Sequence, residues 1–197
     1  NMFPLQPGEK VTVVLPLTDG FRSFPADHYI FMATAQGVVK KTSLDEFSNP
    51  RKAGIIAVDL DEGDFLIGAA LTDGKHDVML FSDGGKAVRF AEDEVRSMGR
   101  AARGVKGMQL EDGQSVIAML VAEDETQSVL TATENGYGKR TSIVEYTRHG
   151  RGTKGMIAIQ QSERNGKVVA ATLVRADDEI MLITDKGVLV RTRVSEI

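Results

Sequence analysis

Short basic segments that contain no acidic residue are the part of this sequence best suited to bind a charged partner. Arg96, Arg100, Arg103 and Lys106 all lie within one of them, residues 95–110. Guanidinium and ammonium groups bind phosphate oxygens well when no neighbouring carboxylate neutralises them. Taken alone, such a cluster is more often a solvated loop than a binding site.

Repetition favours the binding site over the solvated loop, because similar basic clusters occur before and after this one. Charges at equivalent positions of a repeating fold merge into one stripe, and a curved positive stripe suits a curved polyanion. The candidate phosphate contacts are Lys40, Lys41, Arg51, Lys52, Arg89, Arg96, Arg100, Arg103, Lys106, Lys139, Arg140, Arg148, Arg151, Lys154, Arg191 and Arg193. Few aromatic residues accompany them, so duplex DNA is favoured over unpaired bases, with binding largely indifferent to base sequence.

The elements that must position these cations repeat about every fifty residues. Similar segments begin at Tyr29, Asp77, Ser128 and Glu179, and they align on a shared glycine at positions 37, 85, 136 and 187. Each segment consists of two apolar runs around a turn, the pattern of a β-hairpin whose glycine has a positive φ. A basic loop and a further apolar run follow each complete hairpin.

Four strands per repeat predict an all-β, propeller-like fold made of four-stranded antiparallel blades. The loop strands are expected after Arg51, Arg103 and Arg151, and the closing strands at Phe65, Ser115 and Lys167. Residues 11–17 match a closing strand without a hairpin before it. We expect a single domain that is part of a larger ring, divided into residues 1–28 (partial), 29–76, 77–127, 128–178 and 179–197 (partial).

Other chemistry has little support in the sequence. The segment 150–155, GRGTKG, fits a dinucleotide-binding pattern but is followed by a β-type run, which favours a turn. The three histidines lack metal-ligand spacing, no cysteine is present, and no catalytic constellation can be assembled. Asp59, Asp61, Glu62 and Asp64 form an acidic run that we interpret as a solvated turn, with an ion site as the alternative. We therefore predict no catalytic residue, metal or cofactor in this domain.

The overall composition is that of a globular protein in a reducing, cytoplasmic setting. The net charge is −4 with 42% hydrophobic residues, and no apolar run is long enough to span a membrane. A negative net charge argues weakly against nucleic-acid binding, so the placement of the cations matters more than their number.

The segments TENGYGKRTSIVEY, ITDKGVLVRTRVSEI, VKKTSLDEF and VMLFSDGGKAVRF resemble the blades of the DNA gyrase A C-terminal domain. The resemblance extends over the whole chain. It implies a β-pinwheel in which neighbouring blades exchange strands and whose positive outer edge wraps duplex DNA. It also implies a role in negative supercoiling by an ATP-dependent type II topoisomerase, with the gyrase B protein and the rest of the gyrase A protein as partners in a nucleoid-associated heterotetramer. ATP, magnesium and DNA cleavage would belong to other domains.

One departure from that family concerns its basic heptapeptide Gln-Arg-Arg-Gly-Gly-Lys-Gly, which does not occur in this sequence. The family pattern places it before residue 1, so the chain is expected to bind DNA without necessarily supporting supercoiling. Three alternatives remain: a protein-interaction propeller, the equivalent domain of topoisomerase IV, and a propeller hydrolase, for which no catalytic residues are evident.

Overall fold

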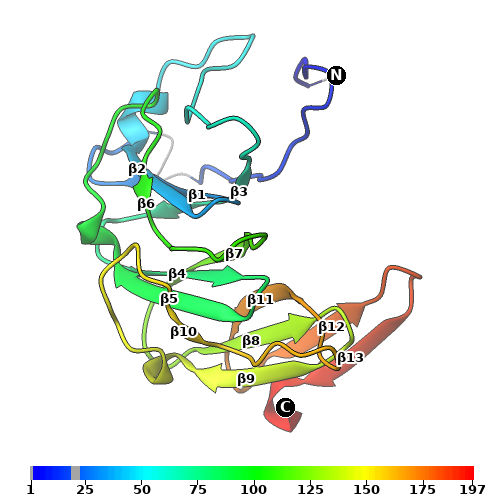
Figure 1. Ribbon diagram of the computed structural model, residues 1–197. Helices are drawn as coiled ribbons and strands as arrows, with labels where there is room; N and C mark the ends of the chain where they lie inside the picture. The colour runs from blue at the N-terminus through cyan, green and yellow to red at the C-terminus, as the bar shows by residue number, and fades with distance from the viewer. Residues whose placement is uncertain (1, 19–22) are drawn as a thin grey trace.

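A computed structural model describes residues 2–18 and 23–197. Apart from strands, the regular elements there are single 3-10 turns: η2 (Leu44–Phe47), η3 (Glu92–Glu94), η4 (Ile143–Glu145) and η5 (Val194–Glu196). Figure 1 shows separate sheets, or blades, that follow one another along an open arc. The predicted all-β, propeller-like fold is confirmed. None of the helical elements in the described ranges could cross a membrane.

Each repeat begins with the predicted antiparallel hairpin. The four hairpins are β1 (Tyr29–Thr34) with β2 (Val38–Ser43), β4 (Asp77–Ser82) with β5 (Lys86–Ala91), β8 (Ser128–Thr133) with β9 (Gly138–Ser142), and β12 (Glu179–Ile183) with β13 (Leu189–Arg193). The shared glycine lies in the turn of every hairpin, with φ between +82° and +84°. L-residues with a side chain rarely adopt this conformation, so the glycines are at the equivalent turn positions that the sequence predicts.

A closing strand pairs with the first strand of each of the first three hairpins. These strands are β3 (Leu66–Thr72), β7 (Val116–Ala122) and β11 (Val168–Val174), which confirms the closing strands expected there. They also contact one another on the concave side of the arc in Figure 1. The closing strand expected over residues 11–17 is wrong, because that segment has no strand. Among the described residues, no hairpin lies before β1 with which it could pair.

The fourth strand of a blade comes from the next repeat. Strand β6 (Val105–Lys106) lies in the loop of the second repeat but pairs with β2 of the first, and β10 (Met156–Ile157) pairs with β5 in the same way. The first two blades therefore have four strands, the third has three and the last has two. The strand expected after Arg51 is absent for the same reason as at residues 11–17. A repeat in the sequence is thus not a blade in space.

The apolar core lies between successive blades, so that a strand can be buried on both faces. In β4, Val78 and Leu80 belong to the cluster shared with the first blade, whereas Met79 and Phe81 belong to the cluster shared with the third. All six residues of β4 are buried. Continuous burial explains why this strand is a nearly unbroken apolar run rather than an alternating one.

We call β6 and β10, which pair with the preceding repeat, the crossing strands. The chain around a crossing strand leaves less space at some of the shared glycine turns than at others, and substitution of the glycines tests this difference. A Cβ at Gly85 would lie 2.3 Å from the carbonyl oxygen of Ile159, whereas a Cβ at Gly136 meets nothing within 4 Å, although the φ values are +84° and +83°. Gly136→Ala should cost about 1–2 kcal/mol of unfolding free energy from the left-handed backbone alone. Gly85→Ala should cost a further ~1–3 kcal/mol from the clash. Urea unfolding of both variants measures the difference, and equal losses would contradict the crossing geometry.

Candidate nucleic-acid interface

The basic loops of successive repeats are joined directly to one another on the convex side of the arc. The Gly152 amide donates to the Gly107 carbonyl at 2.7 Å, and the Gln109 amide donates to the Thr153 carbonyl at 2.9 Å. The first two loops meet through the Asp59 amide and the Ala102 carbonyl, 3.4 Å apart. We call residues 51–59, 100–108 and 151–159 together the outer edge. Its three segments are continuous with one another because their loops share backbone hydrogen bonds.

Two arginines of the outer edge hold the loops together. Arg100 Nη1 donates to the Ile56 carbonyl at 3.1 Å, and Arg151 Nη1 donates to the Lys106 carbonyl at 3.0 Å. Their backbone amides donate to Glu46 and Glu94 of the preceding turns. Both side chains are half-buried. They therefore have a structural role that their place in a basic cluster did not reveal.

The glycines beside these cations also have a structural role. A Cβ at Gly104 would lie 2.4 Å from the Val39 carbonyl oxygen, and one at Gly155 would lie 2.2 Å from that of Ala87. Both glycines have positive φ, and each is followed by the crossing strand of its repeat. Close approach to the neighbouring blade, rather than to a nucleotide, explains Gly155, the last glycine of the GRGTKG segment.

Three of the sixteen candidate cations lie inside the protein. Lys40 is 1% exposed and its Nζ donates to the carbonyls of Ala57 and Arg100; burial lowers the pKa of this amine. Lys41 is 6% exposed, and its Nζ lies 4.9 Å from the centre of the Tyr29 ring. A buried amine cannot reach a phosphate without unpacking the blade, so we leave Lys40, Lys41 and the equally buried Arg89 out of the interface.

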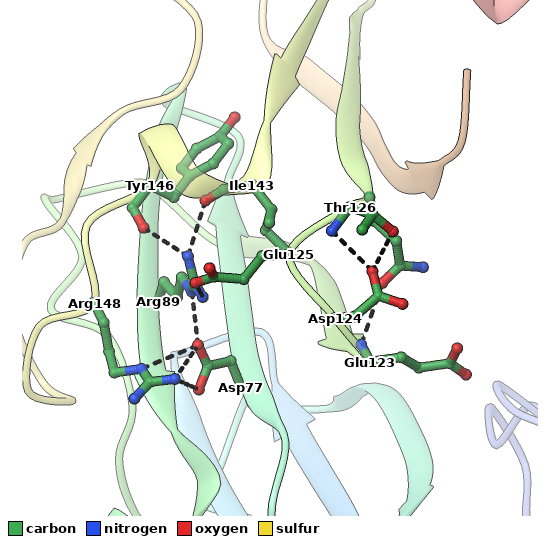
Figure 2. Close-up of polar contacts among 10 residues, drawn as sticks. Asp77, Arg89, Glu123, Asp124, Glu125, Thr126, Ile143, Tyr146 and Arg148 are labelled. Atoms are coloured by element: carbon green, nitrogen blue, oxygen red, sulfur yellow. Dashed lines mark hydrogen bonds and ion pairs between the residues drawn. The ribbon is translucent and has the colours of Figure 1, made fainter.

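Arg89 is the centre of a buried ionic network between the second and third repeats (Figure 2). Its Nε donates to Asp77 at 2.7 Å, and its two Nη atoms reach Glu125 and the carbonyls of Ile143 and Tyr146. Burial, the largest influence, lowers the pKa of Arg89, but the bonds to Asp77 and Glu125 raise it overall. Arg148 also binds Asp77, at 2.9 Å, although its own side chain is exposed.

The network is one version of a contact that recurs in the fold. The cation four residues after the shared glycine donates to a carbonyl in the 3-10 turn of the next repeat, at 2.8–3.1 Å. The pairs are Lys41 with Glu92, Arg89 with Ile143, and Arg140 with Val194. Arg191 has no following repeat in this chain and binds Glu179 instead. The sequence predicted these recurring cations to be phosphate contacts. In the structure, three of them instead form hydrogen bonds that join neighbouring repeats.

The remaining candidates are exposed or half-buried at the surface. Those with a carboxylate partner are Arg103, Arg148, Arg191 and Arg193. Those that are exposed without a side-chain partner among the described residues are Arg51, Lys52, Arg96, Lys106, Lys139 and Lys154. Five of these six lie on or next to the outer edge, and Lys139 is on β9. No group of three or more metal-binding side chains occurs within the described ranges.

Arg103 differs from its neighbours on the outer edge because it binds the acidic run. Its Nε lies 3.2 Å from Asp59 and its Nη1 lies 3.0 Å from Asp61, while its side chain stays 67% exposed. The hydrogen bond to Asp59 raises the pKa of Arg103. Asp64, in the same run, accepts the Gln36 and Phe65 amides. Asp59, Asp61 and Asp64 of the acidic run are therefore bound to the protein itself.

Comparison with known proteins agrees with this architecture. The sequence model described as "DNA gyrase C-terminal domain, beta-propeller" matches residues 28–73, 76–123, 127–175 and 178–197. The chain belongs to this family. The DNA gyrase A protein of Klebsiella oxytoca is 53% identical over 197 residues, which is 100% of this chain and 22% of that protein. The chain thus spans about a fifth of the length of its curated relatives.

Solved structures of gyrase-type C-terminal domains have the same fold. The crystal structure of the C-terminal domain of DNA topoisomerase IV superimposes with a TM-score of 0.90 at 26% identity, covering 100% of this chain and 60% of that one. The structure of a DNA gyrase A C-terminal domain gives 0.78 at 30% identity, covering 88% and 58%. The backbone is thus common to both enzymes, whereas the sequence identity with gyrase A proteins favours the gyrase family over the topoisomerase IV alternative.

The buried network of this gyrase-family domain predicts a stability effect rather than a binding effect. Arg89→Ala leaves Asp77 buried without its main partner, which should cost about 3–5 kcal/mol of unfolding free energy. Arg191→Ala, at the equivalent but 68% exposed position, should cost less than about 1 kcal/mol. Urea unfolding compares the two. A fully stable Arg89→Ala variant with weakened DNA binding would show that Arg89 contacts DNA after all.

Proposed function

We propose that the chain binds duplex DNA along its outer edge and bends the duplex around the arc, through phosphate contacts that do not read the base sequence. The observation that carries this proposal is the hydrogen-bonded outer edge, which exposes Lys106 and Lys154 without acidic partners. Unpaired cations spaced along a convex surface suit the phosphates of a curved duplex. Arg51, Lys52 and Arg96 extend the same surface.

Family membership extends the proposal to the whole protein. We infer that the wrapped DNA supports negative supercoiling by an ATP-dependent type II topoisomerase, in a heterotetramer of gyrase A and gyrase B proteins located in the bacterial cytoplasm. Catalysis, ATP and magnesium would then belong to other domains. The bound duplex would be presented to those domains as a curved segment, so this chain contributes the geometry of the reaction rather than its chemistry.

The rival function is a protein-interaction propeller, for which an exposed apolar face is the relevant feature. Met181 and Ile183 on β12 are 65% and 67% exposed. They occupy the positions of Met79 and Phe81, which are 0% and 1% exposed because the third blade covers them. The apolar face is thus explained as a surface for stacking another blade, and it needs no foreign partner.

The first test is the salt dependence of duplex binding. If about six to ten phosphates are neutralised, affinity should fall roughly a thousandfold or more between about 50 and 200 mM salt. Fluorescence anisotropy with two duplexes of unrelated sequence should give similar affinities, because phosphate contacts carry no base information. A flat salt response would contradict the proposal and favour the protein-interaction function.

The second test removes the free cations of the outer edge without disturbing the arginines that hold its loops. Lys106→Ala with Lys154→Ala should weaken binding by roughly ten- to a hundredfold near 0.1 M salt and lower the log–log salt slope by about two units. Lys75→Ala with Lys167→Ala is the matched control, since both lysines are exposed and lie outside the outer edge. Equal losses in the two double variants would mean that the outer edge is not the DNA path.

A further inference from the structure

Two cations at the same position of consecutive repeats have opposite electrostatic surroundings. Arg103 and Lys154 each precede a glycine that packs against the previous blade, Gly104 and Gly155. Arg103 is bound by Asp59 at 3.2 Å and Asp61 at 3.0 Å, whereas Lys154 has no side-chain partner in the described part of the chain. At the same backbone position, the cation is therefore neutralised in one repeat (Arg103) and free in the next (Lys154).

The difference originates in the preceding loop. Asp59 and Gln109 are equivalent, because each donates its backbone amide to the next loop, at Ala102 and Thr153 respectively. The position of Asp61, two residues further on, is Glu111 in the next repeat, and Glu111 binds Lys86 at 3.2 Å instead. The positions equivalent to Asp59 and Asp61 are therefore a neutral glutamine and an acid that is already paired.

The two carboxylates affect a phosphate at Arg103 in two ways. They occupy the Nε and Nη1 donors of the guanidinium, and they place two negative charges beside the path of the DNA. The pairs are nevertheless weak, because Arg103, Asp59 and Asp61 are 67%, 53% and 49% exposed and water screens them. A phosphate can displace carboxylates from such a site, but only by losing part of its binding free energy.

We propose that Asp59 and Asp61 attenuate DNA binding at the second repeat by competing with phosphate for Arg103. Lys154 of the third repeat then makes the stronger contact, and Arg103 joins only when it exchanges its carboxylates for phosphate. The inference rests on the proposed DNA-binding function of the outer edge. It adds that the phosphate contact at this one loop position is weaker in the second repeat than in the third.

The test is a gain of affinity. Asp59→Asn with Asp61→Asn in the complete chain should tighten duplex binding about threefold to tenfold, the range expected from losing two exposed ion pairs. The matched control is Glu62→Gln with Asp112→Asn, which changes the net charge equally at equivalent turns. Neither control residue has a side-chain bond to any described residue. The control should tighten binding by less than about twofold, since it alters only the distant field.

A cycle with Arg103→Ala separates competition from general charge. In that background the two asparagines should give no more gain than the control, and Arg103→Ala alone should weaken binding less than Lys154→Ala does. A gain that persists without Arg103, or an equal loss from the two single variants, overturns the attenuation. If the double asparagine variant unfolds, Asp61→Asn alone should give about half of the gain on a logarithmic scale.

The same titrations separate this inference from the proposed function. Unmodified chain that shows no salt-dependent duplex binding overturns the proposed function, and the attenuation with it. Normal binding by the unmodified chain, with Asp59→Asn and Asp61→Asn matching the control, overturns the attenuation alone. Circular dichroism of each variant confirms that the blades are folded before affinities are compared.

Discussion

A blade in this fold has two apolar faces, and each face needs a neighbouring blade to cover it. Strand β4 shows the requirement most clearly, because its residues are divided between the cores on its two sides. Burial of this kind is the main driving force of folding, and no single blade can supply it. The stack of blades, its arc and the alignment of its loops all follow from that constraint. The same constraint leaves Met181 and Ile183 of the last blade exposed.

Apolar stacking alone does not fix the register of one blade against the next. Polar contacts between the repeats fix it. The crossing strands β6 and β10 are only two residues long, so few hydrogen bonds hold them in register. The recurring cation adds a bond from the second hairpin strand to the next 3-10 turn. Arg89 also forms a buried ion pair with the Asp77 carboxylate. Removing one partner of such a pair lowers the free energy of unfolding strongly, because it leaves a buried charge unpaired. The fold therefore uses part of its positive charge internally, and only the remainder is available to a partner.

The parts of the fold that could be predicted from the sequence have local signals. The glycine turns and the long closing strands show their own patterns, and the structure confirms them. The two-residue strands β6 and β10 have no periodicity, and only their partners in another repeat define them. Residues 11–17 have a strand-like composition but no partner. Strand formation there depends on a hydrogen-bonding partner, which composition cannot show.

The candidate site was predictable to a similar extent. The recurrence of basic residues in successive repeats predicted the basic loops. It could not distinguish exposed Lys106 and Lys154 from buried Lys40 and Lys41. Alternation in a strand assumes that one face is solvated, and that assumption fails in a blade covered on both sides. A usable signal was the spacing: the cation four residues after the shared glycine contacts the next repeat at Lys41, Arg89 and Arg140, whereas most of the free cations lie in the loops.

Because each repeat keeps the backbone and varies the side chains, charge can be adjusted at one blade without altering the others. The first residue of the hairpin illustrates this: Tyr29 stacks on Lys41, Asp77 binds Arg89, and Glu179 binds Arg191. The loop position of Arg103 and Lys154 shows the same freedom on the surface. Two acids in the preceding loop are enough to change a free cation into a paired one, while the loop itself keeps its hydrogen bonds. The strength of the outer edge can thus vary from blade to blade, and this variation needs only exposed side chains whose replacement leaves the core intact.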